Sequence, residues 1–150
     1  PSLRYDFVNL NLNGNSLGIY AIEEHFDKIL IENNGFREGP ILRLSENDLW
    51  SNRKREISFY GKNLNQTTNF GLDSSPVDTF NPKNIKLDQN KRSQYLFAKE
   101  LLNKYLNGES KASEVFDLDM LAKYFAINDI FSSHHGAIWH NIRLGYIKRH

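Results

Sequence analysis

The sequence predicts an α+β fold in which an antiparallel hairpin-based small lobe is followed by a helical lobe. Apolar residues alternate with polar ones around an Asn-Gly turn near the start, and they recur every three to four positions in the last third. A length of 150 residues with 39% hydrophobic residues suits one globular domain. We expect a β-rich lobe over about 1–60, a loop over about 61–87, and a helical part over about 88–150 that ends in a strand.

The first predicted element is a pair of strands. Residues 5–12 alternate polar and apolar side chains and lead into Asn13-Gly14, the strongest short hairpin signal. Residues 16–22 follow as the returning strand, rich in the bulky side chains that strands favour. An antiparallel hairpin closed at Asn13-Gly14 is therefore predicted.

The next segments are shorter. Residues 23–34 have helical spacing and end in a run of Asn and Gly, which is a helix stop signal. Residues 40–44 and 57–60 have strand character. The stretch after residue 60 is rich in Asn, Gly, Pro and Ser without a clear period, so we expect a loop there.

Two longer helices are predicted in the C-terminal half. The first covers residues 88–107 and is amphipathic, and the second covers residues 117–131 with Asp117 as its N-cap. Apolar side chains surround most of the second helix, which is typical of a buried helix. We therefore expect Leu121 and Phe125 to lie in the core.

A histidine-rich turn precedes a final predicted strand over residues 138–147. Three of the five histidines, His134, His135 and His140, fall within seven positions, and Asn141 follows the last. Imidazole is a common metal ligand. The turn contains no acidic residue, however, so spacing alone favours a hydrogen-bonded structural turn over a metal site.

Charge and composition exclude several classes of function. The net charge is +1, from 19 basic and 18 acidic side chains, so no general attraction to nucleic acid is expected. No apolar run reaches the roughly 20 residues that span a bilayer, so we expect no membrane insertion in this segment. The absence of cysteine excludes disulfides and thiolate metal sites. The common phosphate-loop, nucleophile-elbow and His-Glu-x-x-His motifs are absent as well.

Two charged positions are candidates for binding. Glu24 and Lys28 have the i,i+4 spacing of a helical ion pair, for which a solvated surface pair is the alternative interpretation. Arg43 is a single charge in an apolar strand. It either points to solvent or holds a phosphate or carboxylate in its planar fork.

Several motifs together resemble the CotH kinase-like family, the group of spore coat protein H. Residues 12–28 contain an Asn-Gly hairpin, a Gly-x-Tyr strand and a Glu-x-x-Asp-Lys junction, in that order. Residues 39–43 are similar to the Gly-x-Leu-x-Lys strand of that family, with Arg43 where lysine is usual. Residues 124–131 and 141–146 resemble its buried helix and the asparagine-to-tyrosine strand after it.

This resemblance implies an atypical protein-kinase-like fold that binds ATP and Mg²⁺ and transfers phosphate to protein hydroxyls. The nucleotide-binding residues that it implies are Glu24, Lys28 and Arg43. The resemblance implies that Asn141 lies near the metal and the reacting groups. His135 is the candidate catalytic residue in place of the family's aspartate, and His134 and His140 of the histidine turn are the further candidate metal ligands. The resemblance also favours a secreted, periplasmic or spore- or cell-surface bacterial protein, with an unidentified protein substrate and further domains.

The chain departs from the family at two points. The family usually carries an aspartate as catalytic base shortly before the asparagine, whereas histidines precede Asn141 here. The metal-binding aspartate of the family follows a later strand, beyond His150. We therefore expect this chain to be a segment of a longer protein. The full-length parent would bind ATP and transfer phosphate, whereas the segment alone should bind nucleotide weakly and show no detectable phosphate transfer. The alternatives are a noncatalytic protein-binding or surface module with the same fold, and a metal-dependent hydrolase that uses the histidine turn.

Overall fold

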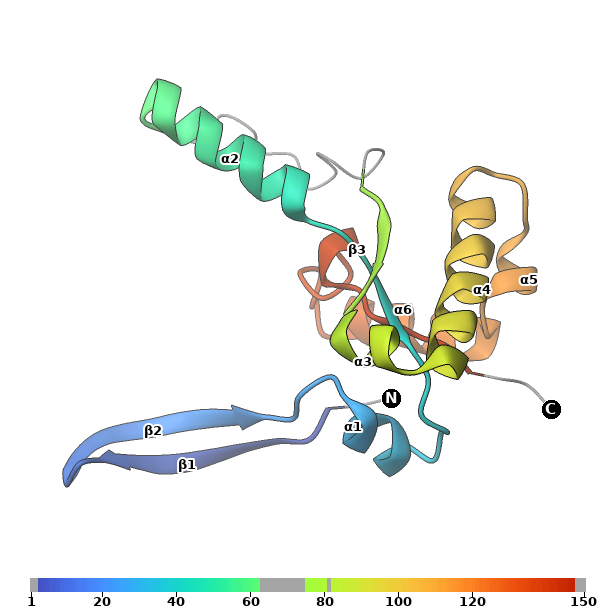
Figure 1. Ribbon diagram of the computed structural model, residues 1–150. Coiled ribbons are helices and arrows are strands. Elements are labelled where there is room, and N and C mark those ends of the chain that lie inside the picture. The colour runs from blue at the N-terminus through green and yellow to red at the C-terminus, as the bar shows by residue number, and fades with distance from the viewer. Residues whose placement is uncertain (1–2, 63–74, 81, 148–150) are drawn as a thin grey trace. The chain divides into compact units, whose positions relative to one another are not determined.

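The computed structural model describes residues 3–62, 75–80 and 82–147 (Figure 1). The described residues up to Gly39, together with Ile147, form one compact unit, and Pro40–Tyr146 form a second. Each unit is described by itself. The mixture of small antiparallel sheets and several helices confirms the predicted α+β class. Within the described residues, no helix is both long enough and apolar enough to cross a membrane.

The first unit is built on the predicted hairpin. Strands β1 (Tyr5–Leu12) and β2 (Asn15–Glu23) pair antiparallel, as the two long blue arrows of Figure 1 show. The connecting residues Asn13 and Gly14 have φ angles of 52° and 83°. Both are left-handed, as the two central residues of a type I′ turn must be, so the Asn-Gly pair fixes the hairpin. The prediction is confirmed.

The short helix that follows begins later than predicted. Helix α1 (Lys28–Asn33) covers only the second half of the predicted range 23–34. The side chain of Asp27 accepts hydrogen bonds from the backbone N–H groups of Ile29 and Leu30, so Asp27 is the N-cap and holds the residues before it outside the helix. The chain leaves the helix at Gly35, which has a φ of 77°.

A three-stranded sheet forms the centre of the second unit. Strand β3 (Ile41–Leu44) lies between β4 (Val77–Thr79) and β5 (Leu144–Gly145), and it pairs antiparallel with both. The predicted strand over residues 40–44 is confirmed. The predicted strand over 138–147 is wrong for most of its length, because a single turn of 3-10 helix, η1 (Trp139–Asn141), occupies its first part.

Two further predictions are corrected here. Residues 57–60 are the end of helix α2 (Asn47–Tyr60) and not a strand. Their β-branched and aromatic side chains favour strands in isolation, but the helix reaches them from residue 47 and stops at Gly61, which has a φ of 67°. The predicted loop contains β4 and helix α3 (Pro82–Leu87), and residues 63–74 of it lie outside the described part.

The long C-terminal helices follow the prediction closely. Helix α4 (Gln89–Leu106) begins after Asp88, and α6 (Leu118–Ile130) begins after Asp117. Each aspartate accepts hydrogen bonds from the first turn of its helix, so both N-caps are real. The four-residue helix α5 (Ala112–Val115) lies between them.

The core of the second unit lies between the sheet and α4. Its buried members are one residue from each of β3 and β4 and two from α4: Leu42, Val77, Ala98 and Leu102. The exposed fraction of Leu42 is 3% and that of Val77 is 2%. Tyr95, Phe116 and Tyr146 pack around this cluster.

The expectation that Leu121 and Phe125 are core residues is wrong. Leu121 is half-buried and Phe125 is 43% exposed, and Asn128 is the buried residue of α6 in the described structure. An apolar pattern all round a helix shows that the helix tolerates burial, but it does not supply the elements that cover it. The backbone carbonyl of Asn128 accepts a hydrogen bond of 2.8 Å from the N–H of Ser133, just before the histidines.

The core assignment predicts a large difference between two leucine substitutions. Leu42→Ala should lower the free energy of unfolding by about 2 to 5 kcal/mol, because it leaves a cavity under the central strand. Leu87→Ala, at a side chain that is 87% exposed, should change it by less than about 0.5 kcal/mol. Urea unfolding followed by circular dichroism measures both. Equal losses would contradict the assignment of Leu42 to the core.

Candidate functional site

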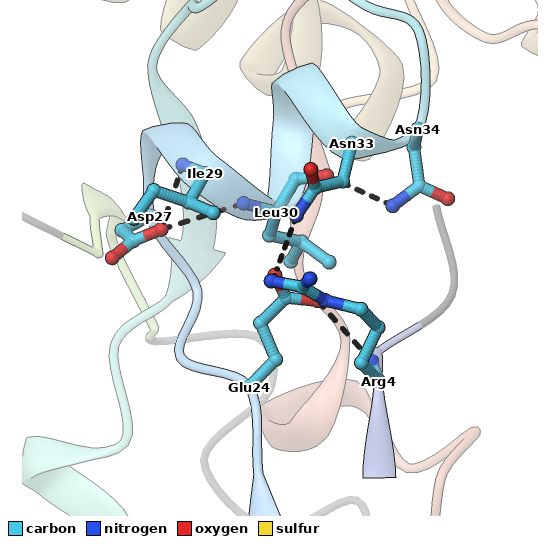
Figure 2. A network of polar contacts seen from close by, with 7 residues as sticks. All are labelled: Arg4, Glu24, Asp27, Ile29, Leu30, Asn33 and Asn34. Atoms are coloured by element: carbon cyan, nitrogen blue, oxygen red, sulfur yellow. Dashed lines mark hydrogen bonds and ion pairs between the residues drawn. The ribbon is translucent and has the colours of Figure 1, made fainter.

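Glu24 is held by partners from its own unit. Its carboxylate oxygen Oε1 lies 2.6 Å from Nη2 of Arg4 and accepts a hydrogen bond of 3.0 Å from the side-chain amide of Asn33. Figure 2 shows these two side chains reaching the carboxylate together. The backbone N–H of Arg4 donates to the other oxygen at 3.2 Å. The Glu24 side chain is only 8% exposed. The hydrogen bond from the Arg4 side chain is the main cause that lowers the pKa of Glu24.

The predicted ion pair between Glu24 and Lys28 does not form. Lys28 is the first residue of α1, and its Nζ lies 3.5 Å from a carboxylate oxygen of Glu32, one turn further along. Because Asp27 caps the helix, Glu24 precedes it, and the i,i+4 spacing does not apply. Both members of the Lys28–Glu32 pair are more than half exposed, so the pair adds little stability.

Arg43 lies on the central strand of the second unit, opposite Asp78 of β4. Its side chain is 27% exposed, so it is neither solvated as a typical surface arginine nor fully buried. The Nη2 atom lies 3.8 Å from Oδ2 of Asp78, which is an ion pair beyond hydrogen-bond distance. The Nε atom is buried and has no hydrogen-bond partner. The guanidinium therefore keeps donor capacity for a ligand.

The histidine turn is a hydrogen-bonded structure anchored to α6. Backbone N–H groups of Gly136 and Ala137 donate to the carbonyls of Ser133 and His134 at 3.0 and 3.1 Å. The hydroxyl of Tyr124 donates to the Gly136 carbonyl at 2.6 Å. These contacts agree with the structural turn that the spacing favoured.

Asn141 completes the turn. Its side-chain nitrogen donates to the carbonyl of His135 at 2.8 Å, so the amide oxygen is the atom that remains for a metal or substrate. The rings of His135 and His140 lie 6.5 Å apart. Over the ranges that the structure describes, no three His, Asp or Glu side chains gather closely enough to hold a metal ion. The assigned roles of His134, His135, His140 and Asn141 stay predictions.

His140 contacts a carboxylate at the start of α2. Its Nδ1 lies 3.8 Å from Oε2 of Glu46, and the indole N–H of Trp50 donates to that same oxygen at 2.6 Å. Burial lowers the pKa of His140, and the Glu46 charge opposes that change. The guanidinium of Arg53 stacks over the Trp50 ring, 4.9 Å from its centroid.

Arg143 is a residue that sequence reasoning did not assign to the site. Its Nη1 donates to the carbonyls of His140 and Ile142 at 2.9 and 3.1 Å, and its guanidinium lies over the ring of Phe80, 5.3 Å from the centroid. Burial, and then the positive charge of Arg43, lower its pKa. The signal available in the sequence was a second single arginine in an apolar stretch, as at Arg43.

The candidate residues are divided between the units. Glu24 and Lys28 belong to the first, and Arg43 and the histidine turn belong to the second. Within the second unit, electrostatic interactions connect His140 with Glu46, Arg53, His135 and Arg143, and connect Arg143 with Arg43. Side chains from β3, α2 and the segment before β5 therefore surround one small region that is rich in arginine.

Comparison with known protein families identifies the class of protein. The chain matches the family described as CotH kinase protein over residues 1–149. It therefore belongs to the CotH kinase family, which confirms the resemblance of its motifs. No curated protein and no solved structure matches the chain.

The Arg4–Glu24 contact predicts a pH dependence of stability. A lowered pKa means that the folded state binds fewer protons, so this contribution is complete above the ordinary carboxylate pKa of about 4.3 and is lost as the pH falls through the lower folded-state pKa. The stability difference between wild type and Glu24→Gln should therefore shrink from about pH 7 to about pH 3. Thermal unfolding measures it.

Glu32→Gln is the matched control, because it removes a carboxylate whose ion pair is solvent-exposed. Its stability difference from wild type should stay small over the same pH range. A Glu24→Gln difference that is the same at both ends of the range would contradict the role given to Arg4.

Proposed function

We propose that this chain is the nucleotide-binding part of a kinase-like protein, which binds Mg–ATP and transfers phosphate to protein hydroxyls. The observation on which the proposal rests is the state of the Arg43 guanidinium. Arg43 is the charged residue of a central strand, and its Nε has no hydrogen-bond partner. Residues 39–43 also resemble the strand motif in which the CotH kinase family usually carries a lysine. A guanidinium in this state suits a phosphate oxygen.

The chemistry of phosphoryl transfer suits such a residue. Transfer depends on positioning and on cations near the phosphates more than on covalent help from the protein. In this proposal Arg43 binds nucleotide phosphate, and Glu24 and Lys28 keep the nucleotide-binding role that the family resemblance implies for them. Glu24 enters that role with its carboxylate already oriented by Arg4 and Asn33.

The proposed metal role fits one residue better than the others. Mg²⁺ prefers oxygen ligands, and the amide oxygen of Asn141 is of that kind, whereas the imidazoles of His134 and His140 suit softer metals. When bound, Mg²⁺ neutralises charge on the phosphates. His135 is the proposed acceptor of the proton from the substrate hydroxyl, in place of the aspartate that the family usually carries.

A second candidate function is a noncatalytic protein-binding module of the same fold, at the cell or spore surface. The observation that favours it is the sequence from His134 to His140, which contains no aspartate. Incubation of the full-length parent protein with radiolabelled ATP and added proteins separates the two candidates. Labelled protein supports the kinase, and nucleotide binding without labelling supports the module.

The proposal predicts that Arg43→Ala weakens the binding of Mg–ATP by at least about tenfold, because a phosphate loses a charge-assisted hydrogen bond. Isothermal titration calorimetry measures the dissociation constant. Arg92→Ala removes one positive charge from an exposed position on α4 and is the matched control, so its affinity should stay within about twofold of wild type. Equal affinities of wild type and Arg43→Ala would contradict a phosphate role for Arg43.

A further inference from the structure

The register of the sheet places a second arginine beside Arg43. In the pairing of β3 with β5, Ile41 lies opposite Gly145 and Leu42 lies opposite Leu144. Arg143 directly precedes β5, and extending the same register by one step would place it opposite Arg43, whose positive charge acts on Arg143. Residues that face one another across antiparallel strands point to the same side of the sheet. The two guanidinium groups therefore belong to one face, opposite the face on which Leu42 joins the core.

Contacts on the Nη1 atom and on one face of the guanidinium hold the Arg143 side chain in place. The Nη1 atom is occupied by two backbone carbonyls, and the aromatic ring of Phe80 lies against the planar group. The Nε atom is buried and makes no hydrogen bond, as is the case for Nε of Arg43. Two preorganised arginines thus lie across from each other, each with an unsatisfied buried donor.

This arrangement is unfavourable without an anion. Like charges directly opposite one another in a sheet are destabilising, and buried donors without partners add a further cost. Asp78 compensates Arg43 only in part, because its carboxylate oxygen is 3.8 Å from Nη2. Glu46 acts on Arg143 but is already hydrogen-bonded to Trp50. A multiply charged anion between the two arginines would remove the repulsion and accept hydrogen bonds from the guanidinium N–H groups that it can reach.

We propose that Arg43 and Arg143 together form a phosphate-binding site, in which Arg143 supplies the second guanidinium. A chain of linked phosphates fits this pair, because each planar fork can bind a different phosphate group. The identification of the source as the polyphosphate of a nucleotide rests on the proposed function. The pairing of the two arginines around an anion does not depend on it.

Inorganic tripolyphosphate tests the site apart from the nucleotide. The probe is titrated by calorimetry into the full chain, in a buffer without phosphate or sulfate. Arg143→Met should weaken its binding by at least about tenfold, the low end for a lost charge-assisted hydrogen bond. Arg143→Lys should also weaken it, because lysine keeps the charge but lacks the fork. Arg92→Met controls for net charge and should stay within about twofold of wild type.

Circular dichroism shows whether each variant is folded at the temperature of the titration. If Arg143→Met is unfolded there, the comparison of wild type with Arg143→Lys decides the result. Thermal unfolding adds a second measurement, since tripolyphosphate should raise the midpoint of wild type more than that of Arg143→Lys.

The outcomes separate this inference from the proposed function. No binding of tripolyphosphate to wild type, or equal binding to wild type and both folded Arg143 variants, overturns the two-arginine site. If Mg–ATP still binds in an Arg43-dependent manner, the proposed function survives that result. Conversely, binding of tripolyphosphate that depends on Arg143, without any binding of Mg–ATP, supports the site and contradicts a nucleotide as its ligand.

Discussion

The second unit depends on the hydrogen bonding of β3 on both of its edges. In the described sheet, β4 and β5 each pair with β3 and not with each other. Leu42 of β3 packs in the apolar cluster with residues of α4. Because side chains alternate along a strand, the burial of Leu42 directs Arg43 to the opposite face. The hydrophobic packing that stabilises the unit therefore also determines where the candidate phosphate-binding charge lies.

Local signals were enough to predict the elements whose ends are set by single residues. Asn13 and Gly14 define the hairpin turn, and Asp117 caps its helix as the sequence predicts. Asp88 caps the helix that was predicted to begin at that residue. The wrong predictions share one cause, which is that the structure of a segment also depends on the elements around it. Residues 57–60 favour a strand when taken alone, yet a helix that starts ten residues earlier includes them. The exposure of Phe125 likewise depends on which elements cover α6, and an apolar pattern around the whole helix does not contain that information.

Some residues of the candidate site could be recognised in the sequence, and others only in the structure. Arg43 was visible in the sequence because a lone charge in an apolar strand is conspicuous. The importance of Arg143 follows from the pairing of β3 with β5, which brings it near Arg43. These two positions are a hundred residues apart, and no pattern in the residues around either one predicts that pairing. For Glu24 the predicted ion-pair partner Lys28 was wrong, and Arg4 and Asn33 could be recognised as its partners only after the hairpin brought residue 4 beside residue 24.

The order of strands in the central sheet also affects how the chain reaches its fold. Strand β3 ends at Leu44, and its partner β5 begins at Leu144. During synthesis, one edge of β3 therefore waits until the residues between them, and then β5 itself, have emerged. An unpaired strand edge can join strands of other molecules, and such distant pairing slows folding. Nascent chains of this protein are thus most exposed to misassembly in the interval before β5 arrives.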